Sequence, residues 1–267
     1  MSKIILITGS TDGIGFATAK SLLELGHSVL LHGRSTDKLT TVKKQLSQVA
    51  SNERIFTYKA DLSVMQEVKD LAQAIENEHQ KLDVLINNAG VFVVPNKVAS
   101  NGLDVRFMVN TIAPYLLTKL LLPLLSNTSR VINLSSAAQA PVTGDELIQP
   151  GALSDNAAYA KSKLALTMWS RQLALSLSDK GPVIVAVNPK SFLASKMVEQ
   201  AYGVKGNNLQ DGADILVRAA LSDEFANASG LYFDNDTGQF AAPHPDALNP
   251  EKIAEITQSL EQLLSVN

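Results

Sequence analysis

The chain has 267 residues, 45% of them hydrophobic and 18% charged, which suits one large α/β domain or two small ones. A formal net charge of −3 provides no basic surface for nucleic acid or for an anionic membrane. The absence of cysteine excludes disulfides and thiolate-ligated metals. The four histidines show no metal-ligand spacing, so we expect surface or hydrogen-bonded histidines and no metal site.

The chain opens on a predicted strand, a glycine-rich turn and a helix. Four consecutive apolar residues at 4–7 are typical of a strand buried on both faces. Gly9 permits a tight turn, Gly13 lets a pyrophosphate approach the backbone, and Gly15 lets helix and strand pack closely. Glycine also serves ordinary turns, but this placement favours an anion site at the helix N-terminus. The predicted dinucleotide site comprises Gly9, Ser10, Thr11, Asp12, Gly13, Ile14 and Gly15.

Strands and helices then alternate along the chain. Further strands are predicted at residues 27–33, 54–59, 82–87, 130–134, 183–187 and 231–233, the last as an edge strand. Helices are predicted at residues 14–25, 37–49, 64–78, 103–125, 157–177 and 251–264. Pro114 is expected to bend the fourth of these helices. The alternation implies one α/β domain over residues 1–267, with a doubly wound parallel sheet of about seven strands, the Rossmann fold.

The residues after the second strand indicate which dinucleotide binds. An acidic residue there bonds the ribose of NAD, whereas an arginine accommodates the additional phosphate of NADP. Arg34 and Ser35 follow this strand without a neighbouring carboxylate, and the guanidinium fork suits phosphate. We therefore predict NADP or NADPH as cofactor, with NAD as the alternative. Asp61, followed by Leu62, either accepts from the adenine amino group or, with Ser63, caps the next helix.

No part of the sequence predicts a membrane anchor or an export signal. The N-terminus shows neither a basic region nor a small-residue cleavage site before its first strand. The longest apolar segment, at residues 113–125, is interrupted by Lys119 and is too short to span a bilayer. We therefore expect a soluble, cytoplasmic protein without membrane or nucleic-acid partners.

Two groups of polar residues follow the fifth predicted strand. Ser135 and Ser136 come directly after it, and the next helix carries Tyr159 and Lys163. Residues four apart share a helical face, so an ammonium beside the phenol stabilises its phenolate. Lowering the tyrosine pKa by about three units takes roughly 4 kcal/mol, more than one exposed lysine supplies. A serine hydroxyl could hold a carbonyl oxygen while the tyrosine supplies a proton. The alternative is a packed aromatic beside a solvated lysine.

Together these motifs resemble the short-chain dehydrogenase/reductase family. The residues that carry the resemblance are the glycine turn, Asn87-Asn88-Ala89-Gly90, Asn110, Ser136 and Tyr159-x-x-x-Lys163. It extends over residues 4–233, and the segment 101–118 is most similar to the retinol dehydrogenase and WW-domain oxidoreductase branch.

The resemblance implies hydride transfer between a nicotinamide and a small carbonyl or alcohol substrate. It implies Tyr159 as general acid/base, Lys163 as ribose ligand and pKa modifier, Ser136 as substrate orienter, and Asn110 as support of a water relay. Ser135 is expected mainly to satisfy backbone and cofactor contacts. The cofactor contacts implied beyond the glycine turn are Asn88, Ala89, Gly90, Tyr159, Lys163, Pro189 and Ser195. Family members commonly pair through helices placed here at 102–125 and 156–178, which implies a homo-oligomer.

The sequence departs from the family pattern at two places. Tyr159 follows Ser136 by 23 positions, so residues 137–158 are expected to loop over the active-site mouth. This insertion either shapes substrate choice, which we favour, or is a simple surface excursion. Lys190 occupies the position of a usual glycine, which puts the cofactor contacts of residues 190–195 in question. Ser195 either meets the cofactor or caps a short helix. The substrate loop is expected at about residues 190–210.

Two other functions share part of this pattern. A non-catalytic dinucleotide-binding regulator is disfavoured because degenerate relatives usually lose the tyrosine or the lysine. Nucleotide-sugar epimerases and dehydratases share the Tyr-x-x-x-Lys pair but space their glycines differently and carry a larger C-terminal region. The absence of cysteine excludes a zinc alcohol dehydrogenase. The leading interpretation is thus an NADP(H)-dependent carbonyl/alcohol oxidoreductase.

Overall fold

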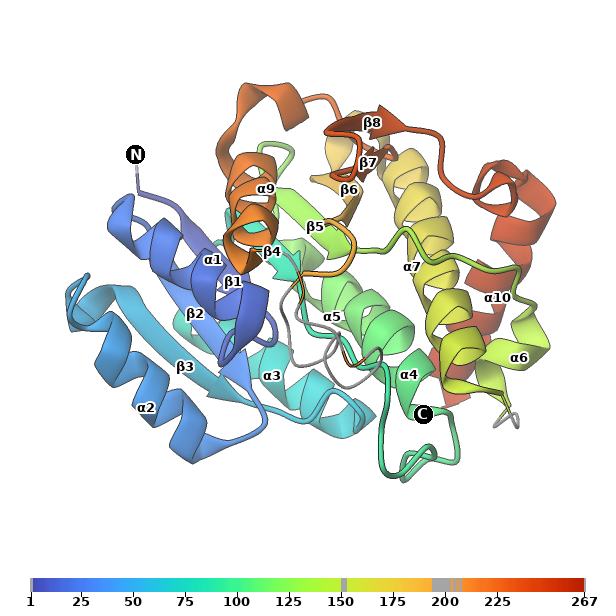
Figure 1. Ribbon diagram of the computed structural model, residues 1–267, viewed down its shortest axis with the longest axis horizontal. Coiled ribbons are helices and arrows are strands. Elements are labelled where there is room, and N and C mark those ends of the chain that lie inside the picture. Colours follow the sequence, from blue (N-terminus) through green and yellow to red (C-terminus); the bar gives the residue numbers. More distant parts are fainter. Residues whose placement is uncertain (1, 150–152, 194–202, 204–205, 207, 267) are drawn as a thin grey trace.

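The computed structural model describes residues 2–149, 153–193, 203, 206 and 208–266. Its strands are β1 (Ile4–Ile7), β2 (Ser28–Gly33), β3 (Ile55–Lys59), β4 (Val84–Asn87), β5 (Arg130–Leu134), β6 (Val183–Asn188), β7 (Tyr232–Asp234) and β8 (Gln239–Ala241). They form one sheet in the order β3-β2-β1-β4-β5-β6-β7-β8 (Figure 1). All neighbouring strands are parallel except β7 and β8.

Helices cover both faces of this sheet. They are α1 (Gly13–Glu24), α2 (Thr36–Leu46), α3 (Met65–Glu78), α4 (Val105–Phe107), α5 (Ala113–Leu121), α6 (Gly144–Ile148), α7 (Asp155–Leu177), α9 (Leu209–Leu221) and α10 (Pro250–Val266). Side chains alternate between faces along a strand, so Ile5 and Ile7 pack with α1, α2 and α9, whereas Leu6 packs with α3, α5, α7 and α10. Figure 1 shows α1 and α9 side by side. The doubly wound Rossmann fold predicted from the sequence is confirmed.

Three elements lie where none is predicted from the sequence. Strand β8 follows a turn in which Gly238 has φ +72°, and it displaces β7 from the sheet edge, so the edge position predicted for β7 is wrong. Helix α6 begins inside a turn-rich segment with a capping box between Thr143 and Glu146. Helix α9 carries apolar residues at helical spacing, including Ile215 and Leu216, that bury against the sheet. This helical spacing of apolar residues can be read from the sequence, although no helix is predicted there.

The helix predicted at residues 103–125 is divided. A π-helical turn at Met108–Ile112 separates α4 from α5, and a 3₁₀ turn at Leu122–Leu124 ends the segment. Pro114 occupies the first turn of α5, where a missing N–H breaks no helical hydrogen bond. The irregularity therefore precedes the proline and centres on Asn110. Such π turns frequently occur at functional sites.

The apolar segment Val105–Leu124 belongs to the core of the chain. By length and composition it could cross a membrane, but 72% of its most apolar window is buried inside the protein. The expectation that the longest apolar segment is too short to span a bilayer is therefore wrong on length, because the helical segment begins at Val105 and not at residue 113. Leu116, Leu117 and Leu121 pack in the core that α10 helps to close. Glu261 of α10 accepts hydrogen bonds from the Tyr115 hydroxyl and from Lys119 Nζ, the latter at 2.6 Å. Homo-oligomerisation through the helices at residues 102–125 and 156–178 stays a prediction.

Candidate active site

A cavity of about 860 Å³ opens at the carboxyl ends of the parallel strands. It is lined by the segments that follow β1, β2, β3, β4, β5 and β6, together with side chains of α7. The sheet order reverses between β1 and β4, and open α/β sheets bind ligands in the crevice at such a switch point. Its volume lies within the range of small-molecule and cofactor sites.

The three glycines of the opening turn have the geometry that their predicted roles require. Gly9 has φ +65°, and a Cβ there would lie 2.9 Å from the Cα of Ala89. A Cβ on Gly15 would lie 2.5 Å from the carbonyl oxygen of Gly9. Gly13 has φ +56° and no atom within 4 Å of its would-be Cβ, which leaves open space beside the backbone. The cavity also contacts Thr11, Asp12 and Ile14.

Neighbouring side chains hold this turn in place. Gly9 N donates to His32 Nδ1 at 3.1 Å, so His32 Nε2 carries the proton that it donates to Ala60 O at 3.1 Å. Burial lowers the pKa of His32 to about 4, which keeps the acceptor nitrogen free at neutral pH. Asn88 Nδ2 donates to Thr8 O at 2.8 Å and to Gly9 O at 3.1 Å. His32 is thus the hydrogen-bonded histidine expected from the sequence, and Asn88 supports the turn besides lining the cavity.

Ser10 and Ser35 do not line the cavity in the described part of the chain. The buried Ser10 hydroxyl accepts from His32 N at 2.9 Å, because its side chain faces the sheet. Ser35 Oγ accepts from Lys38 N at 3.3 Å as the N-cap of α2. The side chains of these two serines thus bond the backbone, and their predicted contact with the cofactor stays a prediction.

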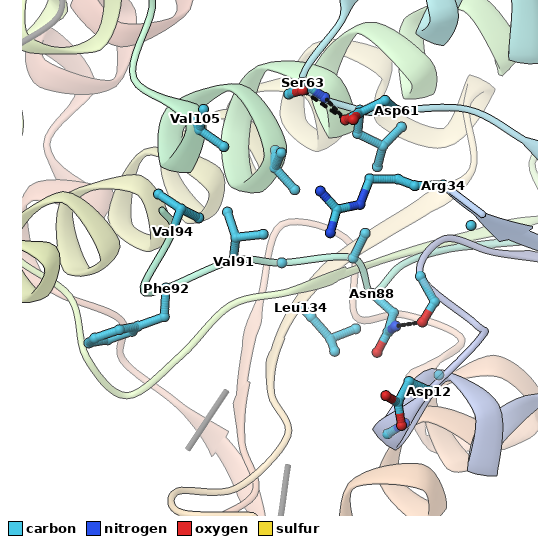
Figure 2. Close-up of a pocket in the computed structure, with 18 of the residues that line it drawn as sticks. Asp12, Arg34, Asp61, Ser63, Asn88, Val91, Phe92, Val94, Val105 and Leu134 are labelled. Carbon is cyan, nitrogen blue, oxygen red and sulfur yellow. Dashed lines mark hydrogen bonds between the residues drawn. The ribbon is translucent and has the colours of Figure 1, made fainter. Parts of the chain in front are cut away.

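Two cations stand at the end of the cavity beside the glycine turn. Figure 2 shows the exposed Arg34 with its guanidinium directed into the cavity between Asp61 and Asn88. Among the described residues no carboxylate forms an ion pair with Arg34. Lys38 lines the same cavity from the first turn of α2. Sequence reasoning missed Lys38, although it stands four positions after Arg34.

Asp61 lines the cavity but does not cap a helix. Its Oδ1 accepts from Ser63 N at 2.9 Å and from Ser63 Oγ at 2.8 Å (Figure 2). The N-cap of α3 is Val64, which makes no side-chain capping bond. The predicted capping alternative is therefore wrong for both Asp61 and Ser63, since their mutual bonds form a turn ahead of the helix. Leu62 also lines the cavity.

Tyr159 and Lys163 share the face of α7 that borders the cavity. Lys163 is only 4% exposed, and its Nζ donates to Leu134 O at 2.6 Å. The same Nζ lies 5.7 Å from the centroid of the Tyr159 ring. The Tyr159 ring also packs against Phe92, with centroids 4.5 Å apart. The alternative of a solvated lysine beside a packed aromatic is wrong. Burial lowers the pKa of the Lys163 ammonium to about 8.

The lowered pKa of Lys163 predicts a pH-dependent cost to the fold. Between pH 8 and the ordinary lysine value of 10.5, the unfolded chain holds a proton that the folded protein releases. The contribution of Lys163 to the free energy of unfolding therefore rises with pH across that window. Below pH 8 the buried ammonium destabilises the fold by its full amount. We expect Lys163→Met to be more stable than the wild type at pH 7.

Urea denaturation of both proteins at pH 7 and pH 10 checks this expectation. The stability difference should narrow at the higher pH, because the wild-type lysine is then neutral in the folded state. Lys44→Met, which removes an exposed lysine of α2, should show no such narrowing. A difference that is constant with pH would contradict the assigned cause.

The two serines after β5 have different surroundings. The Ser135 hydroxyl is buried, within 2.7 Å of Thr167 Oγ1 and 3.4 Å of Lys163 O, and the residue lines the cavity. Ser136 is half-buried and its Oγ accepts from Ala138 N at 3.1 Å. No described residue accepts the proton of the Ser136 hydroxyl. Ser136 is therefore the serine with a free donor, although the described cavity lining does not include it.

Asn110 joins three segments from within the π turn. Its Oδ1 accepts from Val91 N at 2.8 Å and its Nδ2 donates to Val91 O at 2.9 Å. The same Nδ2 donates to Ser162 Oγ at 3.0 Å, on the turn of α7 before Lys163. Asn110 thus bonds the loop after β4 and the Ser162 hydroxyl, and the predicted water relay is not addressed by these contacts.

Lys190 adopts the backbone conformation that glycine usually takes. It has φ +121°, a strained value for a side-chain-bearing residue, and its Nζ forms an ion pair with Asp211 of α9 at 2.6 Å. Pro189 before it lines the cavity. Ser195 and most of the predicted substrate loop lie outside the described residues, so the predictions for them stay predictions.

The insertion between Ser136 and Tyr159 packs away from the cavity where it is described. Helix α6 lies against α10, and Gly144 N donates to Glu255 Oε1 at 2.6 Å. No residue of 137–149 or 153–158 lines the cavity. The described part of the insertion therefore packs on α10 as a surface excursion would, and a role of residues 137–158 in substrate choice stays a prediction.

The end of the cavity opposite the cations is apolar. Val91, Val94 and Val105 gather there in Figure 2, with Phe92 beside them, away from Asp12 and Arg34. Tyr159 reaches this end through its ring contact with Phe92. The glycine turn and the apolar chamber thus line one cavity, with Tyr159 and Lys163 in its wall.

The sequence of the chain matches the short chain dehydrogenase family over residues 3–203. The chain belongs to the short-chain dehydrogenase family. Human polyprenol dehydrogenase is 31% identical over 254 residues, covering 88% of the chain and 77% of that relative. Human retinol dehydrogenase 13 is 30% identical over 270 residues, covering 93% of the chain and 80% of that relative. The resemblance to the retinol dehydrogenase branch is confirmed, and the chain is an oxidoreductase of this family.

Solved structures of short-chain dehydrogenases share the fold. A crystal structure of a Mycobacterium paratuberculosis protein superposes with a TM-score of 0.80 at 25% identity, covering 98% of this chain and 92% of the other. The Pseudomonas aeruginosa RhlG/NADP active-site complex superposes with a TM-score of 0.71 at 26% identity, covering 88% and 95%. The RhlG/NADP complex supports a nicotinamide dinucleotide as cofactor of this short-chain dehydrogenase.

Proposed function

We propose that this protein is an NADP(H)-dependent oxidoreductase that interconverts a carbonyl and an alcohol, with Tyr159 as general acid/base. The observation that carries the proposal is Tyr159 beside the buried Lys163, in a cavity whose other end holds the glycine turn and two cations. The RhlG/NADP complex supports the choice of dinucleotide. A cytoplasmic location without membrane partners belongs to the same proposal.

The residues of the cavity fit a dinucleotide. The open space beside Gly13 would receive the pyrophosphate, because amides at the N-terminus of α1 and its positive dipole end would face the anion there. Arg34 and Lys38 would hold the additional phosphate of NADP, since no carboxylate of the described chain neutralises Arg34. When bound, NADPH supplies a hydride to the carbonyl carbon, and NADP⁺ accepts one in the reverse direction.

The side chains of the chain move the proton. The Tyr159 hydroxyl donates its proton to the oxygen that becomes the alcohol and takes it back in the oxidation. The Lys163 ammonium, 5.7 Å from the ring centroid and screened from water, stabilises the phenolate that forms. The Ser136 hydroxyl donates to the same substrate oxygen and orients it. The apolar chamber of Val91, Phe92 and Val94 receives the rest of the substrate and excludes water.

Coenzyme preference tests the first half of the proposal. We expect Arg34→Asp to weaken NADPH binding by about ten- to a hundredfold, because a charge-assisted hydrogen bond contributes roughly 1.5–3 kcal/mol. Binding of NADH should change little or improve. Calorimetric titration of wild type and variant with both coenzymes gives the four dissociation constants.

Lys44→Asp is the matched control for Arg34→Asp. It makes the same change in charge on an exposed residue of α2 that does not line the cavity, so NADPH affinity should be retained. Equal losses of NADPH affinity in both variants would show that long-range charge, and not contact with the phosphate, causes the effect of Arg34→Asp. Tighter wild-type binding of NADH than NADPH would overturn the assignment to NADP. Oxidation of NADPH with a panel of aldehydes and ketones completes the test.

A further inference from the structure

The carbonyl oxygen of Ser136 is held by two side chains from distant parts of the chain. Tyr232, on β7, donates its hydroxyl proton to Ser136 O at 3.2 Å. Gln139 donates from Nε2 to the same oxygen at 2.9 Å. A carbonyl oxygen has two lone pairs, so these two donors satisfy it fully. The Ser136 peptide is therefore fixed in orientation, and so is the bond from its Cα to the side chain.

The orientation of both donors is itself determined. The Gln139 amide accepts from His244 N through Oε1 at 3.2 Å, which turns its Nε2 toward Ser136. Tyr232 is only 6% exposed and sits in the sheet, where it pairs with Ala186 of β6. Burial raises the pKa of the Tyr232 phenol, so its hydroxyl keeps the proton that it donates. Neither donor needs to reorganise when a ligand arrives.

The same loop is tied to α7 beside Tyr159. Ala140 N donates to Ala160 O at 3.3 Å, one residue after the tyrosine. Ser136 Oγ accepts from Ala138 N, which closes a turn and leaves the hydroxyl proton for another acceptor. The loop is thus supported from β7, from the segment before α10 and from α7, while the Ser136 hydroxyl keeps its proton for another acceptor.

We propose that Tyr232 is a positioning residue, whose hydroxyl fixes the Ser136 peptide so that the Ser136 hydroxyl meets the substrate oxygen. This inference rests on the proposed function of Ser136. Tyr232 touches neither substrate nor cofactor in this scheme, and its contribution passes entirely through Ser136. Loss of its hydroxyl therefore has a cost only while the serine hydroxyl is present.

A double-mutant cycle between Tyr232→Phe and Ser136→Ala tests this dependence. Tyr232→Phe alone is expected to lower kcat about three- to tenfold, the effect of one hydrogen bond, with the NADPH dissociation constant unchanged. In the Ser136→Ala background the same substitution should lower kcat by less than about twofold, because coupled residues are not additive. Independent effects that multiply in the double variant would overturn the proposal.

Tyr58→Phe is the matched control. Tyr58 is 7% exposed, and its hydroxyl bonds Glu78 at 2.7 Å and His79 at 2.8 Å, outside the cavity. Removing the same atom there should leave kcat unchanged. If Tyr232→Phe fails to fold, Gln139→Met removes the second donor to the same carbonyl and should show the same coupling to Ser136→Ala.

The outcomes separate this inference from the proposed function. Ser136→Ala with reduced kcat beside Tyr232→Phe with wild-type kcat would overturn the role of Tyr232 alone. Wild-type kcat in Ser136→Ala would overturn both, because the residue through which Tyr232 acts would have no role. Reduced kcat in both single variants with little further loss in the double variant is the expected result.

Discussion

Tyr159→Phe is expected to lower kcat by about 10²–10⁴-fold, the usual contribution of a positioned general acid. The substitution removes the group that transfers a proton to the substrate oxygen, whereas the Ser136 hydroxyl only donates a hydrogen bond to it. The ring remains, with its packing against Phe92 at 4.5 Å between centroids, so the fold and the NADPH affinity should be retained. Steady-state oxidation of NADPH with the best carbonyl of the panel measures the loss.

Tyr115→Phe provides the comparison for this variant. The Tyr115 hydroxyl bonds Glu261 of α10, and Tyr115 does not line the cavity. Its removal should leave kcat unchanged. Melting temperatures and NADPH titrations confirm that each variant is folded and binds its coenzyme. Turnover of Tyr159→Phe within about threefold of wild type would remove Tyr159 from the mechanism, since general acid catalysis contributes more.

The sequence predicts those parts of the molecule that depend on neighbours along the chain. Buried parallel strands are short apolar runs, such as residues 4–7 and 130–134, so all seven strands of the parallel part were found within two residues. The turn at Gly9, Gly13 and Gly15 needs positive φ or close approach, which only glycine tolerates. A phenol and an ammonium four residues apart on one helix must lie side by side. Local geometry alone fixes each of these.

The missed features depend on contacts between distant residues. Lys163 is buried because α7 packs against β5, and no local pattern distinguishes it from a solvated lysine. Tyr232 meets Ser136 across 96 positions, and His32 accepts from Gly9 across 23. Strand β8 has three residues and no apolar alternation, so only its pairing with β7 reveals it. These partners become visible once the sheet brings the strand ends together.

Lys190 takes a backbone conformation that favours glycine, although it carries a side chain. The residue takes φ +121° despite its side chain, at a cost of order 1–3 kcal/mol. Its ion pair with Asp211 and the bond from Asn235 Nδ2 to Pro189 O at 3.0 Å hold the loop where it is. The sequence alone does not decide between a shifted loop and a strained lysine. The partners that hold this loop, Asp211 on α9 and Asn235 after β7, are distant along the chain.

Arg106→Met is expected to lower the free energy of unfolding by about 3–5 kcal/mol, the cost of leaving a buried charge without its partner. Arg106 is fully buried, and its guanidinium donates to Asp104 at 2.6 Å from Nε and 2.5 Å from one terminal nitrogen. It also pairs with Asp155, the first residue of α7. These hydrogen bonds raise the pKa of Arg106, so the arginine stays charged. Urea denaturation monitored by circular dichroism measures the loss.

Arg218→Met and a double variant decide whether the buried charge is the cause. Arg218 pairs with Glu224 at 2.6 Å, and more than a third of each side chain is exposed to solvent. Such exposed ion pairs contribute at most about 1 kcal/mol to stability. Asp104→Asn in the Arg106→Met background removes the uncompensated carboxylate and should recover part of the lost stability. Because Asp155 stands one helical turn before Tyr159, Arg106→Met should also lower kcat, and the double variant should not restore it. A cost no greater than that of Arg218→Met would show that the buried pair merely offsets its own desolvation.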